Sequence, residues 1–386
     1  VGSEMCIRDS ATTVELVEGL VATSQNCWPS VSFDFGAINN LLNKFFPAGF
    51  YYKTFMWPKN FWYKIYEPII RKAAGLGVAP LKPDPDRYEH KFEYCDVLIA
   101  GSGPSGLASA LAAAKNGARV ILAEDKPRFG GSLLTDEVTI GNKKGKDWAD
   151  ETISQLKSMP NVIVKNRSQV FGYYDHNMMV MFERTKDHIE NPTEFTPRQR
   201  LWYIRAKEVI VSTGSIERPL VFGNNDRPGI MLASAAKEYM KVYGVLVGKK
   251  PIIFTNNDSA YDTAVEFKKN GVNPLVVDIR ANSKSSVVQE AKNLNINIKF
   301  SYGVVNTKGY KKVSSATIGE LNSNKSGYEN LENVSCDCIC VSGNWTPTVH
   351  LSSQSGNKLK FSKDIDAFVP DKSKQKEISQ NQPNSR

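Results

Sequence analysis

The glycine run at residues 101–106 is the part of this sequence whose residue types and spacing best fit ligand chemistry. Its pattern is G-x-G-x-x-G, and its members are Gly101, Ser102, Gly103, Pro104, Ser105 and Gly106. In such a turn the first glycine permits a tight bend, the second lets a pyrophosphate approach the backbone, and the third lets a helix pack closely on a strand. The helix that follows offers free N–H groups to phosphate oxygens. The run therefore predicts a binding site for a dinucleotide diphosphate.

An acidic pair follows the glycine run at the expected distance. Glu124 and Asp125 begin 23 residues after Gly101 (124 − 101), at the end of an apolar segment. An acid about 20 residues beyond the turn is expected to accept hydrogen bonds from the adenosine ribose. Carboxylates there also repel a 2′-phosphate, which argues against NADP. Lys126 and Arg128 follow the acids rather than replace them.

Two further small-residue segments extend the predicted pocket. The first is Gly130-Gly131-Ser132, and the second is the turn Thr213-Gly214, which follows the segment Val-Ile-Val-Ser at 209–212. Similar segments pass beside the ribose and adenine end of the nucleotide in two-dinucleotide-binding flavoproteins. We therefore add both to the candidate site.

Apolar segments alternate with helical ones from residue 96 onward. The expected strands are 96–100, 119–123, 162–166, 178–185, 207–214, 251–255, 274–278 and 333–343, and the expected helices are 104–116 and 259–270. Strand–helix–strand units imply a parallel sheet covered by helices. We predict an α/β protein with a two-dinucleotide-binding Rossmann fold of the FAD/NAD(P)-binding, pyridine nucleotide-disulfide oxidoreductase type.

The second strand–helix–strand unit lacks the glycines of the first. Residues 255–261 read Thr-Asn-Asn-Asp-Ser-Ala-Tyr, so a pyrophosphate could not readily approach the backbone. Asp258 or Ser259 is the expected N-cap of the helix. This unit is predicted to keep the fold without normal dinucleotide binding.

The expected organisation has five parts. They are a cloning or assembly scar at 1–10, an aromatic-rich segment and linker at 11–90, a dinucleotide-binding domain at 91–240 plus 335–370, an inserted degenerate Rossmann-like subdomain at 241–334, and a disordered tail at 371–386. The aromatic side chains of the N-terminal segment are expected to pack against a neighbouring domain or subunit.

Composition excludes several functional classes for the 386 residues. The net charge of +9 comes from basic residues that are spread along the chain, so we predict no nucleic-acid partner. No apolar run is long enough to span a membrane, and the six cysteines form no C-x-x-C, so a reducing cytoplasm is expected.

No catalytic or metal-binding residue is predicted. Cys336, Cys338 and Cys340 are expected to share one face of a buried strand rather than to hold a metal. None of the four histidines stands in a Ser-His-Asp or H-x-x-x-H arrangement. The sequence thus indicates a nucleotide pocket and no chemistry of its own.

The chain resembles the α subunits of heterotetrameric sarcosine oxidase over roughly residues 11 to 370. The resemblance is carried by residues 95–134, 201–235, 254–264 and 341–361, where NNDRPG and SGNWTP are the more specific stretches. It implies nucleotide contacts at Ser105, Glu124, Asp125, Lys126, Ser132 and Val170.

The resemblance also implies a function. The family's complex oxidises sarcosine to glycine, passes the one-carbon unit to tetrahydrofolate and forms hydrogen peroxide. FAD and a covalent FMN are expected in the β subunit, NAD in the α subunit, and γ and δ subunits in the same hetero-oligomer. The folate domain of the family is not matched, so we expect an internal fragment of an α subunit that is not catalytic alone.

Two alternatives stay open. The glycine turn and acids fit FAD as well as NAD, as in the α subunit of a related proline- or opine-type dehydrogenase. The chain could instead be a scaffold with an empty nucleotide pocket.

Overall fold

The structure is a computed structural model that describes most of the chain. The described residues are 15, 18–21, 27–38, 55–74 and 83–379. The chain divides into two compact units, one formed by residues 1–88 with 185–198 and the other by residues 89–184 with 199–386. The predicted scar at 1–10 lies outside the described residues.

The first unit contains short elements. They are β1 (Pro29–Ser30), β2 (Phe33–Asp34), η2 (Phe35–Ala37), η4 (Trp62–Tyr66) and α4 (Glu67–Ala73). Strands β1 and β2 form an antiparallel pair. Several of its aromatic side chains are exposed, among them Trp28, Trp57 and Tyr63.

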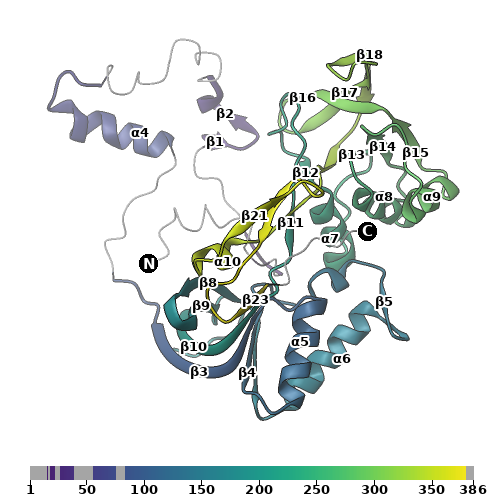
Figure 1. Cartoon of the computed structure of the whole chain (residues 1–386). Coiled ribbons are helices and arrows are strands. Elements are labelled where there is room, and N and C mark those ends of the chain that lie inside the picture. The colour runs from purple at the N-terminus through teal and green to yellow at the C-terminus, as the bar shows by residue number, and fades with distance from the viewer. Residues whose placement is uncertain (1–14, 16–17, 22–26, 39–54, 75–82, 380–386) are drawn as a thin grey trace. The chain divides into compact units, whose positions relative to one another are not determined.

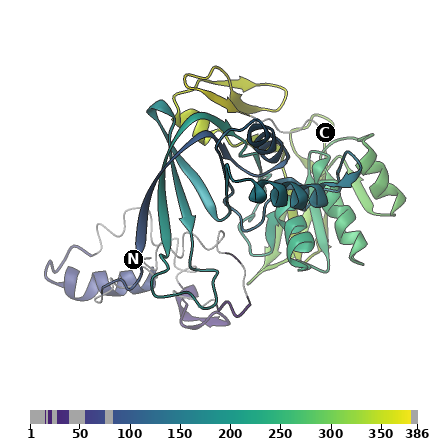
Figure 2. The same ribbon diagram turned by 90° about the horizontal axis from the view of Figure 1, so that it is seen from below.

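The larger unit is built on a sheet with the strand order β7-β4-β3-β10-β9-β8, and β23 pairs with β10 (Figures 1 and 2). The strands are β3 (Tyr88–Ala100), β4 (Val120–Ala123), β7 (Val162–Lys165), β8 (Ser168–Tyr174), β9 (Met178–Arg184), β10 (Gln199–Val211) and β23 (Glu377–Ser379). The parallel pairing of β3, β4 and β7 confirms the predicted strand–helix–strand unit.

Two helices, α5 (Pro104–Lys115) and α6 (Gly145–Ser158), pack on one face of this sheet. Leu107 of α5 and Leu156 of α6 are fully buried with Ile99 and Leu122 of the strands. On the other face, Trp202, Tyr173 and Leu98 belong to a second apolar cluster. Burial on both faces explains why β3 and β4 end in uninterrupted apolar runs.

A second parallel sheet has the order β12-β19-β13-β14-β15. Its strands are β12 (Ile230–Leu232), β13 (Pro251–Thr255), β14 (Leu275–Asp278), β15 (Asn297–Phe300) and β19 (Cys338–Ser342). One face packs against α7 (Ala233–Tyr243), α8 (Ser259–Lys269) and α9 (Ser286–Asn293). The other face packs against an antiparallel sheet of β16 (Tyr302–Gly309), β17 (Val313–Leu321) and β18 (Tyr328–Ser335).

Short elements complete the unit. They are η5 (Gly131–Leu134), β5 (Thr139–Ile140), β6 (Lys143–Lys144), η6 (Asp175–Asn177), β11 (Ser215–Glu217), β20 (Trp345–Pro347), α10 (His350–Gln354), β21 (Leu359–Ser362) and β22 (Ala367–Pro370). None of the described helices is long and apolar enough to span a bilayer.

The second sheet extends beyond the subdomain limits of 241–334. It includes β12 before residue 241 and β19 after residue 334, because β19 lies between β12 and β13 and pairs in parallel with both. After residue 334 the chain therefore inserts β19 between β12 and β13 of this sheet, and only later does β23 pair with β10 of the first sheet.

The expected disorder of residues 371–386 is wrong for 371–379; residues 380–386 lie outside the described part. Strand β23 pairs in parallel with β10, with Ile378 opposite Ile210. Glu377 accepts hydrogen bonds from the hydroxyls of Ser352 at 2.6 Å and Ser355 at 2.8 Å. These backbone and side-chain bonds order a segment that has little apolar surface.

Candidate functional site

Gly101 and Gly106 are required by the protein's own packing. Gly101 follows β3 with φ of 103°, and a Cβ atom there would lie 2.2 Å from the carbonyl oxygen of Ser212. A Cβ atom on Gly106 would lie 2.0 Å from the carbonyl oxygen of Gly101. The turn, the helix α5 and the end of β10 therefore come together only if both positions lack side chains.

Gly103 differs from its two neighbours. Its φ of −66° and ψ of −177° are open to any residue, and a Cβ atom there would meet no atom within 4 Å. Gly103 is also the N-cap of α5, whose first turn receives no hydrogen bond from a capping side chain. Nothing in the described protein requires glycine at this position, so the open space beside it fits a ligand, and the helix terminus fits an anionic one.

The carboxylate of Glu124 is buried against the glycine turn. Its Oε2 atom accepts from the backbone N–H of Ser102 at 3.0 Å and from the Ser102 hydroxyl at 2.5 Å. Its Oε1 atom accepts from the backbone N–H of Lys126 at 3.0 Å. The side chain thus joins the end of β4 to the glycine turn, while Asp125 beside it is exposed.

Burial raises the pKa of Glu124 to about 7, and the adjacent Asp125 adds to the rise. The hydrogen bonds from Ser102 and Lys126 act in the opposite direction but do not offset the loss of hydration. Additional donors, such as ribose hydroxyls, would favour the ionised form.

The second glycine pair lies against the first turn. The N–H of Gly130 donates to the Ser102 carbonyl at 3.1 Å, and a Cβ atom on Gly131 would lie 2.9 Å from the Cα atom of Gly103. Both residues have positive φ, of 123° and 55°. The structure therefore brings residues 130–132, at the start of η5, to the same place as residues 101–106.

The turn after β10 lies on the other side of the glycine run. The N–H of Ser212 donates to the Ala100 carbonyl at 2.8 Å, which holds the ends of β3 and β10 together. Thr213 donates through its hydroxyl to the Thr348 carbonyl at 3.1 Å, and Gly214 has φ of 67°. The sequence could not identify the role of Ser212, because its backbone makes these contacts: its N–H bonds to Ala100, and its carbonyl oxygen lies against Gly101.

The other predicted residues take different positions. Pro104 and Ser105 form the start of α5, and Ser105 is exposed. Val170 lies on β8 and packs against an apolar cluster of the sheet, so its side chain belongs to the core. The N–H of Ser168, two residues earlier, donates to the Glu124 carbonyl at 2.7 Å. This bond places the start of β8 beside the acidic pair.

Lys126 is engaged with a helix of the second sheet. Its Nζ atom lies 2.8 Å and 2.9 Å from the two carboxylate oxygens of Glu238 on α7. Burial alone would lower the pKa of Lys126, but the contact with Glu238 outweighs that effect and raises it. Glu238 carries no signal in the sequence, because it lies 112 residues from its partner.

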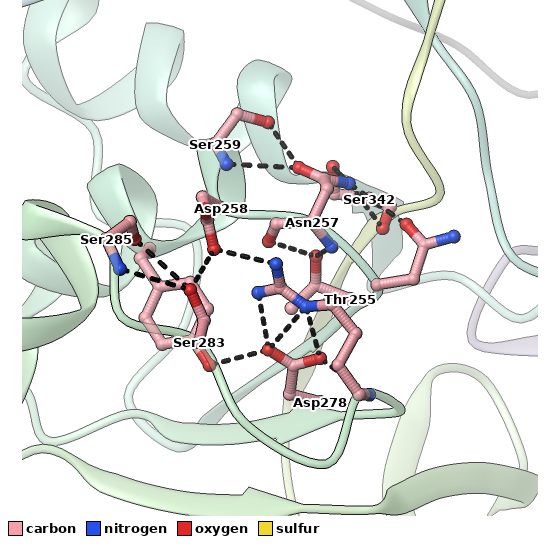
Figure 3. Close-up of polar contacts among 11 residues, drawn as sticks. Thr255, Asn257, Asp258, Ser259, Asp278, Ser283, Ser285 and Ser342 are labelled. Atoms are coloured by element: carbon pink, nitrogen blue, oxygen red, sulfur yellow. Dashed lines mark hydrogen bonds and ion pairs between the residues drawn. The ribbon is translucent and has the colours of Figure 1, made fainter. Parts of the chain in front are cut away.

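The second strand–helix–strand unit is closed by its own side chains (Figure 3). The guanidinium of Arg280 bonds to Asp278 at the end of β14 and to Asp258 before α8, both at 2.8 Å. Asp278 is fully buried and also accepts from the hydroxyl of Tyr261 at 2.7 Å. In a nucleotide-binding unit these positions face the ligand.

Asp258 is the N-cap residue of α8, as predicted, but its side chain makes no capping hydrogen bond. The side chain of Asn257 accepts from the Ser259 N–H instead, at 3.0 Å (Figure 3). Its amide also donates to the hydroxyl of Ser342 at 3.0 Å. The turn thus contains a hydrogen-bonded asparagine side chain and no glycine, so a diphosphate has less room to approach its backbone. This supports the predicted loss of nucleotide binding in the second unit.

The three clustered cysteines do not share one face. Cys338 and Cys340 do, with 3.7 Å between their sulfur atoms. Cys336 precedes β19 and packs in the cluster on the opposite face of the sheet, because Asp337 leaves the strand to accept from the N–H groups of Lys249 and Lys250.

A cavity beside residues 127–129 does not include the glycine turn. It measures about 480 Å³ and is lined by α6 and residues 127–129. Arg128, Lys146 and Lys157 contribute cations, and Lys146 is paired with Asp150 at 2.8 Å. Neither the glycine turn nor the acidic pair lines this cavity, so it is distinct from the candidate site.

Comparisons with known proteins agree with this geometry. A family model described as FAD dependent oxidoreductase matches residues 96–168. Sarcosine oxidase subunit alpha from Rhizobium meliloti (strain 1021) is 44% identical over 366 residues, which is 93% of this chain and 35% of that protein. The same subunit from Corynebacterium sp. (strain P-1) is 36% identical over 77% of this chain and 31% of that protein. The chain thus spans about a third of the length of these relatives.

Among solved structures, L-proline dehydrogenase from P. horikoshii aligns with a TM-score of 0.55 and 21% identity, over 75% of this chain and 51% of that one. This likeness concerns the fold. It confirms the predicted dinucleotide-binding Rossmann architecture.

Proposed function

Because this chain is a homologue of sarcosine oxidase alpha subunits over 93% of its length, we propose that it binds NAD at residues 101–106 as part of an amine-oxidising complex. The diphosphate lies beside Gly103 and the first turn of α5, and the adenosine ribose lies at Glu124 and Asp125. When bound, NAD is a nucleotide that can accept or donate a hydride. The protein's part is to bind and orient it.

The open space at Gly103 is the observation that carries this proposal. Glycines 101 and 106 are explained by contacts inside the protein, whereas a Cβ atom on Gly103 would meet nothing within 4 Å. A glycine that the fold does not need is best explained by a ligand that approaches the backbone. Glu124 and the Gly130–Gly131 turn border the same place.

The wider reaction is also part of the proposal. In the full assembly, sarcosine is oxidised to glycine, the one-carbon unit goes to tetrahydrofolate, and hydrogen peroxide is formed. The α subunit works there with β, γ and δ partners, and FAD and covalent FMN reside in the β subunit. We assign no catalytic residue to the described part of this chain.

FAD is the second candidate ligand. The family model that matches residues 96–168 is named for FAD, and the pocket's glycines and acids fit either dinucleotide. Under this alternative the chain resembles the α subunit of a proline- or opine-type dehydrogenase.

The spectrum of the purified chain and two titrations test these proposals. We expect no flavin absorbance and a measurable heat of binding with NAD⁺. A chain that is purified with bound flavin would contradict the NAD proposal and favour FAD. If calorimetry detects no heat with either NAD⁺ or FAD, the chain is a scaffold with an empty pocket.

A further inference from the structure

We propose that Glu238, on helix α7, is a specificity-determining residue. Its ion pair with Lys126 keeps that cation from binding a 2′-phosphate, so the site rejects a 2′-phosphorylated nucleotide. This inference rests on the proposed NAD site. Part of the selection of NAD over NADP is thereby assigned to a residue of α7, a helix that packs on the second sheet.

Lys126 is placed where a 2′-phosphate would need a cation. Its backbone N–H donates to Oε1 of Glu124 at 3.0 Å, so it lies directly beside the carboxylate expected to hold the ribose. Sites that accept NADP use a basic side chain near this position to bind the phosphate. The residue type and place of Lys126 would therefore suit NADP if its ammonium were free.

The ammonium of Lys126 is instead turned toward α7. Both carboxylate oxygens of Glu238 lie within 2.9 Å of its Nζ atom. Glu238 is fixed on a helix whose neighbouring lysines are also bound: Lys237 lies 2.8 Å from Asp136, and Lys241 lies 2.9 Å from Glu137. These ion pairs hold α7 in place beside the nucleotide loop.

Two other basic residues near the acidic pair donate to backbone carbonyls, which orients their guanidinium groups without neutralising them. Arg128 donates to the Val242 carbonyl at 3.3 Å, and Arg184 donates to the Asp125 carbonyl at 2.6 Å. A phosphate added to the ribose would then face the carboxylates of Glu124 and Asp125 with Lys126 already paired. Repulsion between the phosphate and these carboxylates disfavours binding.

Removal of the Glu238 charge tests the inference. NAD⁺ and NADP⁺ are titrated calorimetrically into nucleotide-stripped protein of the wild type, Glu238→Gln, Lys126→Ala and the double variant. Glu266→Gln serves as the matched control, because Glu266 forms a comparable ion pair with Lys241 at 3.3 Å. We expect Glu238→Gln to raise the NADP⁺ affinity by about tenfold, the effect of roughly one new charged hydrogen bond. The NAD⁺ affinity should change by less than about twofold, because NAD⁺ has no group at this position.

The double variant identifies the cation that is released. The gain in NADP⁺ affinity should disappear in Glu238→Gln/Lys126→Ala, and Glu266→Gln should bind both nucleotides as the wild type does. An unchanged NADP⁺ to NAD⁺ ratio in Glu238→Gln, or a wild type that binds both equally well, overturns this inference alone. Failure of the wild type to bind NAD⁺ overturns the proposed function instead.

Discussion

The hydroxyl of Ser102 donates to Oε2 of Glu124 at 2.5 Å, and this bond joins the glycine turn to the acidic pair at the end of β4. Ser102 is fully buried, and its hydroxyl also accepts from the N–H of Gly130 at 3.2 Å. One serine therefore links the glycine turn, the acidic pair and the second glycine pair. A nucleotide would meet a pocket whose three sides are already joined by hydrogen bonds.

Replacement of Glu124 should affect both stability and binding. Glu124→Ala leaves the buried Ser102 donors without their acceptor, which should lower the free energy of unfolding by about 1–3 kcal/mol. Lost bonds to ribose should weaken NAD⁺ binding by about 1–3 kcal/mol as well. Chemical denaturation and calorimetry measure the two effects separately. Unchanged NAD⁺ affinity would mean that the ribose lies elsewhere.

The pKa of Glu124, raised to about 7, predicts that NAD⁺ binding depends on pH. Ribose hydroxyls donate to the ionised carboxylate, so binding at lower pH must first remove a proton. We expect the affinity to be constant above pH 7 and to fall below it, by at most about tenfold per pH unit. Glu124→Gln, which cannot ionise, should show a flat profile between pH 5 and 8. An equal slope in both proteins would contradict this assignment.

The same pKa has the opposite consequence for the ligand-free protein. The unfolded chain loses this proton near the ordinary glutamate pKa of 4.5, whereas burial raises the pKa in the folded chain to about 7. The contribution of Glu124 to stability is therefore greatest at low pH and declines as the pH rises from 4.5 to 7. Denaturation of the wild type and Glu124→Gln across this range measures the difference.

Gly103 and Gly106 of the turn should respond differently to substitution. Gly103→Val should keep the fold and abolish nucleotide binding, because its side chain enters open space where the diphosphate would lie. Gly106→Ala should destabilise the fold, because its Cβ atom would lie 2.0 Å from the Gly101 carbonyl. Gly327→Ala is the matched control, with ordinary contact at 3.6 Å from Asn322. Thermal unfolding and NAD⁺ titration test all three, and normal binding by Gly103→Val would misplace the diphosphate.

The glycine turn and its elements could be predicted because their signals are local. Strand, turn and helix follow one another between residues 96 and 116, and each has its own residue pattern. The first half of β3 was missed because residues 88–94 are mostly exposed and lack an apolar run. Strand β3 lies beside β10 in the sheet, and no local residue pattern in the sequence indicates that pairing.

Partners that are distant in sequence could not be predicted. Glu238 reaches Lys126, and Arg184 reaches the Asp125 carbonyl, only after the two sheets and the β8–β10 strands have been assembled. Strand β23 was missed for a related reason. Its order depends on bonds between Glu377 and α10, and polar residues in such bonds cannot be told from polar residues in a disordered tail.

Arg280 should stabilise the second strand–helix–strand unit in the place of a nucleotide. In Arg280→Ala the buried Asp278 carboxylate loses the guanidinium. Its remaining described donors are the Tyr261 hydroxyl and the backbone N–H of residue 280. We expect a loss of about 1–3 kcal/mol in the free energy of unfolding and unchanged NAD⁺ affinity at the first turn. Arg280→Lys keeps the charge but not the two-sided contact, so it should recover only part of the loss. A variant as stable as the wild type would show that Asp258 and Asp278 do not need the guanidinium.

The order of residues 371–379 predicts that Glu377 matters for stability although it lies near the end of the chain. Its carboxylate accepts from Ser352 and Ser355, on and next to α10, and from the amide of Asn357. Glu377→Ala removes one acceptor from three donors and should lower the free energy of unfolding by about 1–3 kcal/mol. Lys372→Ala, at an exposed position in the same segment, is the control and should have an effect within about 0.5 kcal/mol. Denaturant titration compares the two, and hydrogen exchange of the Val209–Val211 amides reports on the pairing of β23 with β10. Equal stability of both variants would mean that the bonds of Glu377 do not order residues 371–379, as the prediction of a disordered tail implies.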